Sequence, residues 1–203
     1  MLRVGLTGGA ASGKSTVCKL LAEGGAKIID ADRLAKELSA PDQPAWRSIL
    51  QTFGNQYALD DGQLDRKALR ELIFTDEAAR SKLEQILHPP IRKAIIAQMH
   101  NATADLVVIA VPLLIEAQMQ DLFDRILVIT ADDKVKQQRL QQRDAISPQL
   151  ARQILNAQID EQRRLHYADD IIDNNHSQHA LASQVEMLLK VYRQHCHFNK
   201  PAQ

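Results

Sequence analysis

Residues 8–15 are the feature that most constrains how this chain can fold. They read Gly-Gly-Ala-Ala-Ser-Gly-Lys-Ser, which matches the pattern Gly-x-x-x-x-Gly-Lys-Ser. The apolar run Leu2–Leu6 precedes the pattern and a helical stretch follows it. A phosphate-binding loop needs this setting, with a strand before it and a helix after it. The segment therefore predicts the opening unit of an α/β fold with a nucleotide site at its first turn.

The expected chemistry of this loop follows from its backbone and two side chains. Backbone N–H groups from Gly9 to Ser15 can surround a β-phosphate, and the following helix adds its positive N-terminal end. Lys14 is expected to reach the β- and γ-phosphate oxygens, and the Ser15 hydroxyl to ligate Mg²⁺. A glycine-rich turn arising by chance would have to place Lys14 and Ser15 in register by accident, so we expect a real site.

The bulk composition narrows the classes of partner. The chain has 203 residues, with 25 Lys and Arg, 25 Asp and Glu, and a formal net charge of zero. This balance lacks the basic footprint of a nucleic-acid-binding protein, and no apolar run approaches the roughly 20 residues of a membrane helix. We expect no nucleic acid and no membrane partner.

The two cysteines, Cys18 and Cys196, favour a reducing, cytoplasmic compartment, and we expect no signal peptide before the first strand.

Short apolar runs alternate with helical patterns along the chain. The run Leu106–Val111 is apolar throughout, as expected for a central strand that is covered on both faces. Alternation of this kind predicts a parallel α/β sheet. The predicted strands are Leu2–Leu6, Lys27–Asp30, Leu106–Val111, Arg125–Ile129 and Asp170–Ile172. The helices predicted between and after them include Val17–Glu23, Arg33–Leu38, Asp132–Gln142 and Ser177–His195.

The stretch between the second and third predicted strands is too long for a single crossover. It holds helical patterns around Trp46–Phe53, Arg66–Phe74 and Glu77–Leu87, with another after Pro90. Because proline disfavours helical geometry in the residue before it, we expect one helix to end at Leu87-His88-Pro89-Pro90. The pattern indicates a mostly helical insertion.

A second excursion, from about residue 138 to 164, is rich in Arg and Gln and poor in large apolar residues. Ser147-Pro148 suits the cap and first turn of a new helix within it. Such a polar helical hairpin is either a mobile lid over the phosphates or a plain solvated helix pair. Arg139 and Arg143 are spaced so that one helix face presents both, and arginines in a lid can neutralise phosphoryl charge.

Two carboxylates follow the second predicted strand, in the sequence Asp30-Ala31-Asp32. Ligands of open α/β sheets bind at the carboxyl ends of strands, so this position is close to a γ-phosphate. If both residues were extended they would face the same side. One can assist the Mg²⁺ shell and the other can accept a hydroxyl proton from an acceptor alcohol. The alternative for Asp32 is a helix N-cap.

Segments after two other predicted strands also carry candidate residues. Pro112-Leu113-Leu114-Ile115-Glu116 could hold an apolar or pantetheine-like arm of a substrate, although the pattern favours core packing for the two leucines. Past the last predicted strand, the amides of Asn174 and Asn175 can hydrogen-bond an adenine edge or form an Asx turn.

Taken together, these segments resemble the dephospho-coenzyme A kinases, a family of P-loop kinases of the nucleoside-monophosphate-kinase-like group. The matching segments occur in the family's order and span nearly the whole chain. They are Gly5–Gly9, Ser12–Thr16, Ile29–Asp32, Leu87–Pro89, Pro112–Glu116, Gln142–Asp144 and Ala168–Asn174.

The resemblance implies a P-loop NTPase-type five-stranded parallel sheet flanked by helices, with a helical acceptor-binding insertion and a helical lid. The expected core is about residues 1–31, 105–137 and 165–203, the insertion about 32–104 and the lid about 138–164. The implied reaction is transfer of phosphate from ATP to the 3′-hydroxyl of dephospho-coenzyme A, the last step of coenzyme A synthesis, with Mg²⁺ as the metal. It leaves the oligomeric state open.

The resemblance and the loop pattern together assign the site residues. The expected catalytic residues are Asp32, Lys14 and Arg143, and the expected Mg²⁺ ligand is Ser15. The expected ATP-binding residues are Gly9, Ala11, Ser12, Gly13, Lys14, Ser15, Thr16, Arg139 and Asn174. The expected acceptor-binding residues are Thr7, Asp32, His88, Pro112, Leu113, Leu114 and Glu116.

One departure from the family pattern is Ala11, where glycine is usual. A methyl group there fits only a backbone that does not need positive φ. Two other functions remain open on the residues alone: a P-loop kinase of another small alcohol or a nucleoside, and a nucleotide-binding switch. Against the switch, the chain has no guanine-reading Asn-Lys-x-Asp segment.

Overall fold

The computed structural model describes residues 1–198, which form two compact units. The first comprises residues 1–30 and the described residues from 99 onward, and the second comprises residues 31–98. In the part of the chain that is described, no helix is both long and apolar enough to cross a membrane.

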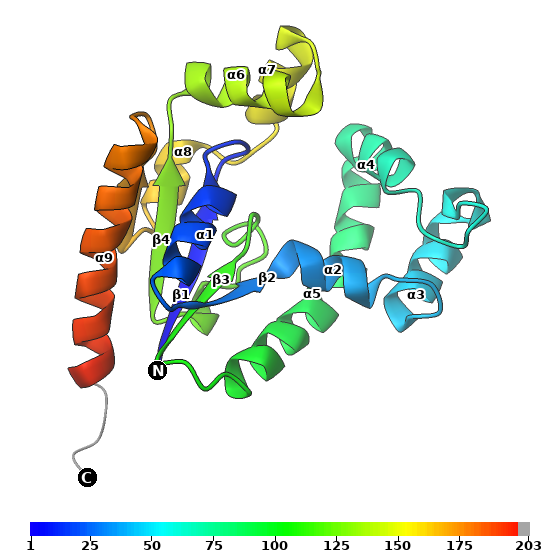
Figure 1. Cartoon of the computed structure of the whole chain (residues 1–203). Coiled ribbons are helices and arrows are strands. Elements are labelled where there is room, and N and C mark those ends of the chain that lie inside the picture. Colours follow the sequence, from blue (N-terminus) through cyan, green and yellow to red (C-terminus); the bar gives the residue numbers. More distant parts are fainter. Residues whose placement is uncertain (199–203) are drawn as a thin grey trace. The chain divides into compact units, whose positions relative to one another are not determined.

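The first unit is built on a five-stranded, fully parallel sheet, as predicted (Figure 1). Its order is β2-β3-β1-β4-β5, so the strand that leads into the phosphate loop lies in the middle. The strands are β1 (Leu2–Gly8), β2 (Lys27–Asp30), β3 (Leu106–Ala110), β4 (Arg125–Thr130) and β5 (Asp170–Asp173). β1 runs two residues past its predicted end because Thr7 and Gly8 still pair with β4.

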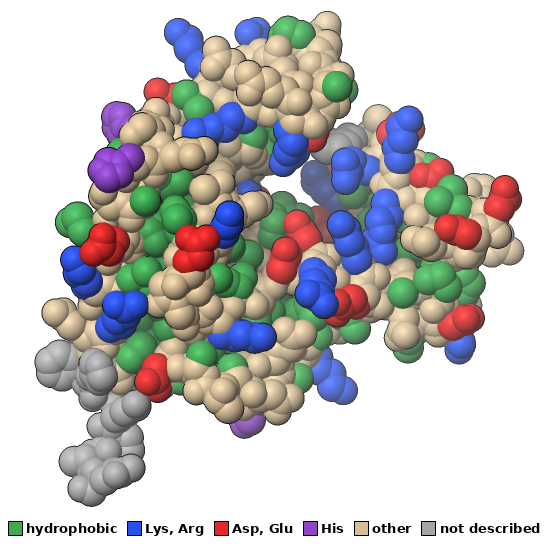
Figure 2. All heavy atoms as spheres, in the orientation of Figure 1, with side chains coloured by type: hydrophobic (Ala, Val, Ile, Leu, Met, Phe, Trp, Pro, Cys, Tyr) green, Lys and Arg blue, Asp and Glu red, His purple; other side chains and the backbone are tan. Residues whose placement is uncertain are grey.

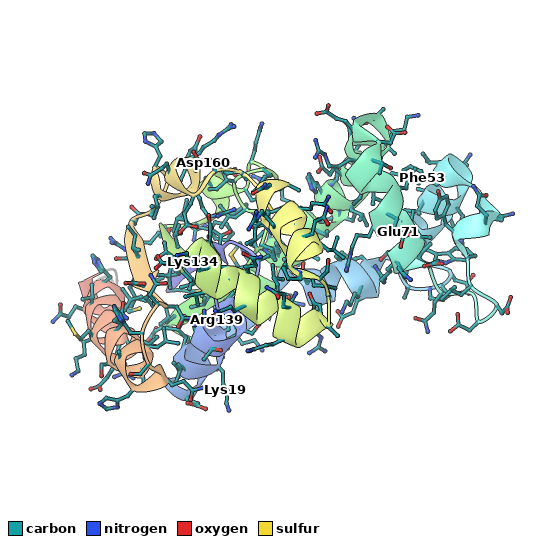
Figure 3. All side chains as sticks on the ribbon, turned by 90° about the horizontal axis from the view of Figure 1, so that it is seen from above. Lys19, Phe53, Glu71, Lys134, Arg139 and Asp160 are labelled. Carbon is teal, nitrogen blue, oxygen red and sulfur yellow. The ribbon has the colours of Figure 1, made fainter. Side chains whose placement is uncertain are left out.

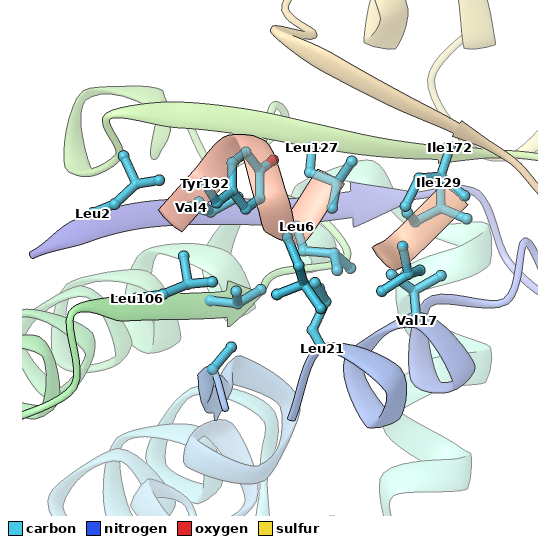
Figure 4. Packing of buried hydrophobic residues seen from close by; sticks show 14 of the residues in the cluster. Leu2, Val4, Leu6, Val17, Leu21, Leu106, Leu127, Ile129, Ile172 and Tyr192 are labelled. Atoms are coloured by element: carbon cyan, nitrogen blue, oxygen red, sulfur yellow. The ribbon is translucent and has the colours of Figure 1, made fainter. Parts of the chain in front are cut away.

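Helices α1 (Lys14–Glu23) and α9 (Gln178–Phe198) contribute to one hydrophobic core with the sheet. Val17 and Leu21 of α1 are fully buried, and Tyr192 of α9 is buried among the same residues (Figure 4). α1 ends at a turn in which Gly25 takes a φ of +93°, a conformation that glycine adopts without steric cost. The pair Gly24-Gly25 therefore stops the helix and directs the chain into β2.

The remaining helical elements of this unit are short. They are η2 (Gln120–Leu122), α6 (Asp133–Asp144), α7 (Pro148–Asn156) and α8 (Glu161–Leu165). The expected cap at Ser147 is confirmed, since its hydroxyl accepts a hydrogen bond from the Leu150 N–H at 3.2 Å. α6 and α7 pack as a hairpin, and it lies at the end of the sheet where β1 and β4 terminate (Figure 1).

The second unit is helical throughout its regular elements. These are α2 (Ala31–Leu38), α3 (Pro44–Phe53), η1 (Asn55–Tyr57), α4 (Arg66–Thr75) and most of α5 (Glu77–His100). Its own small core centres on Ile49, Leu50, Leu64 and Leu69. The indole N–H of Trp46 donates to the Gly62 carbonyl at 2.9 Å, which ties α3 to the loop before α4. The predicted helices around residues 46–53 and 66–74 are confirmed.

The predicted helix end at His88-Pro89-Pro90 is wrong. α5 continues through both prolines to His100. Proline removes a backbone donor and strains the preceding turn, but this is a local cost that packing can offset. Apolar residues on both sides of the prolines, including Ala79, Ile91 and Ile95, are buried, and their burial favours one continuous helix.

Candidate active site

The backbone of the phosphate loop takes positive φ at two positions, and it is strained at Ala11. Gly13 takes a φ of +103° and Ala11 a φ of +56°. An alanine at position 11 would be free of strain only at negative φ. Ala11 instead occupies the left-handed region that favours glycine, so its backbone is strained. Hydrogen bonds from Arg139 and Asn174 to the carbonyls of Ala11 and Ser12 hold the loop in this conformation. The loop closes into α1 through the Thr16 and Val17 N–H groups, which donate to the Gly13 carbonyl at 3.0 and 3.1 Å.

The Lys14 side chain folds back onto the start of the phosphate loop. Its Nζ donates to the carbonyls of Gly8 and Gly9 at 2.8 and 2.9 Å, so the ammonium group sits across the mouth of the loop. Ser15 and Thr16 are exposed in the first turn of α1. Their backbone N–H groups belong to the helix end that attracts anions.

Asn174, just past β5, and Arg139 of α6 both contact the loop. The Asn174 side chain is 6% exposed, and its amide nitrogen donates to the Ser12 carbonyl at 2.7 Å. A Cβ on Gly13 would come within 2.0 Å of that nitrogen, which explains the absence of a side chain there. Arg139 donates to the Asn174 carbonyl at 3.0 Å and to the Ala11 carbonyl at 3.4 Å, and Figure 3 shows Arg139 between α6 and α1.

This network assigns Asn174 a contact that the sequence did not predict. The two alternatives were an adenine contact or an Asx turn, but in the structure its amide nitrogen binds the loop carbonyl. The turn beyond β5 is formed by Asp173 instead, whose carboxylate accepts the Asn175 N–H at 3.0 Å. The side chain of Asn175 pairs with Asp132.

Three further side chains surround the first turn of the loop and are not among the predicted site residues. The Gln158 amide oxygen accepts the Ala10 N–H at 2.9 Å. Around Gly9, the atoms nearest to the position of an added Cβ are Gln158 Oε1, Lys136 Cδ and Arg164 Nη1, at 3.4, 3.6 and 3.7 Å. All three come from the chain between α6 and α8, whose contacts with the loop are long-range and carry no local pattern.

Lys136 is buried with two acidic partners. Its Nζ contacts Asp133 at 2.9 Å and Glu161 at 2.5 Å. Although burial alone lowers the pKa of this lysine, hydrogen bonds to Glu161 and Asp133 raise it, and the pKa is raised on balance. The ammonium group therefore stays charged and links α6 to α8.

The segment after β3 divides between core and surface. The Thr7 hydroxyl donates to the Pro112 carbonyl at 3.1 Å, which joins the ends of β1 and β3. Leu114 is fully buried, as predicted, but Leu113 is 47% exposed. The expectation of core packing for Leu113 is wrong, because the turn that follows Pro112 sends the two adjacent side chains in different directions.

Asp30 and Lys14 share an electrostatic environment. Burial raises the pKa of the Cys18 thiol to about 11, the Asp30 carboxylate adds to the rise, and the Lys14 ammonium opposes it. Asp30 is exposed at the carboxyl end of β2, so its carboxylate and the Lys14 ammonium group both act on the Cys18 thiol of α1.

These oxygen groups fit Mg²⁺ held together with phosphates. Among residues 1–198, no cluster of three or more His, Cys, Asp or Glu side chains could hold a metal by itself. Mg²⁺ typically uses one or two protein oxygens and completes its shell with water and phosphate. The exposed hydroxyl of Ser15 and carboxylate of Asp30 match that donor set.

Three other predicted site residues belong to helices α2, α5 and α6. Asp32 and His88 belong to the second unit, Asp32 in the first turn of α2 and His88 half-buried within α5. Asp32 is the second helical residue, so it is neither an N-cap nor extended beside Asp30. Arg143, near the end of α6, is exposed and pairs with Asp144 through two hydrogen bonds of 2.7 Å.

The α6–α7 hairpin carries exposed basic side chains. Lys134, Arg143 and Arg152 are exposed along it, and Figure 2 shows Lys and Arg side chains over this part of the surface. Since the whole chain has no net charge, this local excess of positive charge is the kind of feature expected beside a polyphosphate.

A parallel five-stranded sheet with a lysine-bearing phosphate loop at the end of its middle strand defines a P-loop kinase fold. A family model described as dephospho-CoA kinase matches residues 2–180. The chain belongs to this family.

Individual relatives agree with that assignment. A dephospho-CoA kinase of Coxiella burnetii is 42% identical over the full length of both chains. The solved dephospho-CoA kinase of Campylobacter jejuni superimposes with a TM-score of 0.69 at 27% identity, covering 95% of this chain and 98% of that one. The solved protein TT1252 of Thermus thermophilus gives a TM-score of 0.80 at 27% identity, covering 94% and 97%.

Proposed function

We propose that this protein transfers the γ-phosphoryl group of ATP to the 3′-hydroxyl of dephospho-coenzyme A, giving coenzyme A and ADP. In this step the 3′-oxygen forms a bond to the γ-phosphorus of ATP. The bond between the γ-phosphorus and the β,γ-bridging oxygen breaks, and ADP leaves. Membership of the family supports the acceptor, and the phosphate loop supports the donor. The free thiols of Cys18 and Cys196 accord with action in the cytoplasm.

On the donor side, the loop residues Gly9 to Thr16 hold the phosphates. Backbone N–H groups bind the β-phosphate, and Lys14 exchanges its contacts with the Gly8 and Gly9 carbonyls for phosphate oxygens. Ser15, with Asp30 nearby, would hold Mg²⁺, which when bound neutralises charge that develops on the β- and γ-oxygens. Arg139 and Asn174 hold the loop backbone by hydrogen bonds. Both side chains therefore lie beside the loop, where they would also contact ATP.

On the acceptor side, Asp32 accepts the proton of the attacking 3′-hydroxyl. It stands two residues beyond Asp30, and it lies in the first turn of α2. Thr7 and His88, with the segment Pro112–Glu116, would hold the remainder of the acceptor.

The helical insertion, about residues 32–104, would form the acceptor-binding domain, and residues 138–164 a lid. Arg143 would leave Asp144 and turn to the phosphates when the lid closes. A helix pair joined by a short turn, with a polar exposed surface, suits a segment that closes over a ligand and excludes water.

The single observation that carries the proposal is the family match over residues 2–180, which no other P-loop function explains. The experiment is ADP release measured in a coupled assay with a panel of acceptors: dephospho-coenzyme A, adenosine, a nucleoside monophosphate and shikimate. We expect turnover with dephospho-coenzyme A to exceed that with the others by orders of magnitude. Turnover with a nucleoside and none with dephospho-coenzyme A would refute the assigned acceptor. Nucleotide-dependent binding of a protein partner without any acceptor phosphorylation would instead favour a switch.

A further inference from the structure

Arg164 is a buried cation with one side-chain N–H, at Nε, that has no hydrogen-bond partner among the described residues. It lies in α8 and is only 3% exposed. The acidic group nearest to pairing with it is Glu116, whose carboxylate lies 4.0 Å from Nη2 and is 26% exposed, too far for a hydrogen bond. A buried guanidinium with so little compensation is costly, and such groups persist where a ligand completes the set.

The position of Arg164 beside the phosphate loop indicates which ligand could supply its missing hydrogen-bond acceptor. Its Nη1 lies 3.7 Å from the point that a Cβ on Gly9 would occupy. Lys14 Nζ binds the carbonyl of the same residue at 2.9 Å. The loop lysine reaches the β- and γ-phosphates of a bound nucleotide, so Arg164, beside Gly9, stands near the place where the loop would hold these phosphates.

The other cations near the loop are already neutralised or occupied. Lys136 is paired with Asp133 and Glu161. Arg139 donates to the Ala11 carbonyl in the loop and to the Asn174 carbonyl just past β5, and Arg143 is paired with Asp144. Arg164 therefore differs from all three in combining burial, closeness to Gly9 and an unpartnered N–H.

A neighbouring contact holds Arg164 in this place. The Gln158 amide oxygen accepts the Ala10 N–H at 2.9 Å, and the Lys136–Glu161 pair joins α6 to α8. Gln158 precedes α8 and Glu161 is its first residue, so the first contact ties the start of α8 to the loop and the second ties it to α6. The guanidinium is thus positioned before any nucleotide binds.

We infer that Arg164 is a further catalytic residue of this kinase, one whose guanidinium binds the γ-phosphate of ATP and stays on the phosphoryl group during transfer. This inference rests on the proposed function, whose donor site it completes. Charge spreads over the equatorial oxygens of the transferring group, and a planar fork of N–H donors matches them better than a lysine does. Glu116 serves as the weak counter-ion that the phosphate replaces.

The test compares Arg164→Gln and Arg164→Lys with Arg163→Gln. Arg163 is adjacent in the chain, of the same type, and exposed, so it controls for loss of one charge from α8. Binding of ATP and of ADP is measured by calorimetry with Mg²⁺, together with kcat and KM. Thermal unfolding shows whether each variant is folded.

For Arg164→Gln we expect ATP affinity to fall about 10-fold to 100-fold, the size of a lost charge-assisted bond, and ADP affinity to change less than about 3-fold. The value of kcat should fall about 10³-fold, as for other arginines that stabilise phosphoryl transfer. Arg163→Gln should resemble the unmodified protein. Arg164→Lys should show the same ATP-selective defect in smaller degree, and it decides the question if Arg164→Gln does not fold.

Equal losses for ATP and ADP would overturn the inference and make Arg164 a structural residue, and so would an unchanged ATP affinity. The binding measurements need no acceptor. They therefore test Arg164 even if dephospho-coenzyme A proves not to be phosphorylated, and the two failures can be told apart.

Discussion

At the scale of single residues, Ala11 shows how a loop backbone can be held in a conformation that its side chain disfavours. Its φ of +56° costs an alanine about 1–2 kcal/mol relative to glycine. The Arg139 guanidinium and the Asn174 amide hold the neighbouring carbonyls of Ala11 and Ser12. The contacts of Arg139 and Asn174 therefore fix the loop backbone in a conformation that the alanine side chain would not favour by itself.

This strain gives a prediction for Ala11→Gly. Relief of the left-handed conformation should outweigh the extra chain entropy of glycine, about 0.5–1 kcal/mol. We expect the free energy of unfolding to rise by about 0.5–1 kcal/mol and the Tm by about 1–3 °C, measured by calorimetry. Ala10→Gly is the matched control, because Ala10 is not among the described residues with positive φ, and it should lower the Tm. A lower Tm for Ala11→Gly would contradict the account of strain.

Asp32 tests the proposed acid–base chemistry. In Asp32→Asn the side chain keeps its size but cannot accept the hydroxyl proton, so kcat should fall by about 10²–10⁴-fold. The KM for ATP should change by less than about 3-fold, because the donor phosphates do not depend on this carboxylate. Steady-state kinetics at saturating acceptor measure both values.

The control for Asp32 is Glu37→Gln on the same helix. Glu37 is exposed and pairs with Arg33 at 2.7 Å, so its loss removes a charge from α2 without touching the proposed chemistry. We expect its kcat to be unchanged. A near-normal kcat for Asp32→Asn would remove Asp32 from the mechanism.

Residue-scale features differ in how far the sequence predicts them. Lys14 and Ser15 are set by spacing within one turn, so a local pattern is enough. Arg163 and Arg164 are chemically identical in sequence, and only the packing of α8 buries one and exposes the other. The contacts of Gln158 and Asn174 with the loop likewise join residues more than a hundred positions apart.

At the scale of elements, strand and helix positions follow from local pattern, whereas helix ends depend on packing. All five strands occur where apolar runs predict them. α5 is the main exception, since Pro89 and Pro90 stand inside it. Proline is a strong local signal for a helix end. Burial of apolar residues before and after the prolines, such as Ala79 and Ile91, depends on the tertiary fold and outweighs that signal.

The start of β1 is joined to the start of β4 by an ion pair with a predictable pH dependence. Asp124 accepts from the Arg3 backbone N–H at 2.8 Å and from Arg3 Nε at 3.0 Å. The Arg3 side-chain hydrogen bond holds the pKa of Asp124 below its usual value. A lowered carboxyl pKa means that this stabilisation is complete above the unfolded pKa, about 3.9, and is lost as pH falls through the folded pKa.

We therefore expect Asp124→Asn to lower the free energy of unfolding at pH 7. Both side chains are more than a third exposed, at 39% and 34%, so solvent screening limits the loss to about 0.5–1 kcal/mol. Urea denaturation at pH 7 and near pH 2 measures the difference between the variant and the unmodified protein. The two proteins should converge at the lower pH. A difference of the same size at both pH values would show that the carboxylate charge contributes nothing.

At the scale of the whole molecule, the chain divides into a sheet unit and a helical unit. The helical unit has its own small core around Ile49 and Leu69, which explains how so long an excursion can separate β2 from β3. Its existence was predictable from the length of the interval between these strands. The boundary at residues 98–99 was not, because it falls inside α5, where the local sequence pattern does not change.

The central claim is that the loop at Lys14 holds ATP while a ribose hydroxyl of dephospho-coenzyme A attacks it. The most direct measurement is ³¹P NMR of a reaction that contains the protein, Mg²⁺, ATP and dephospho-coenzyme A, with mass spectrometry of the product. We predict that ADP and coenzyme A appear in equal amounts, with the new phosphate on the 3′-oxygen of the ribose. Release of inorganic phosphate with the acceptor unchanged, or phosphate at any other position, would contradict the claim.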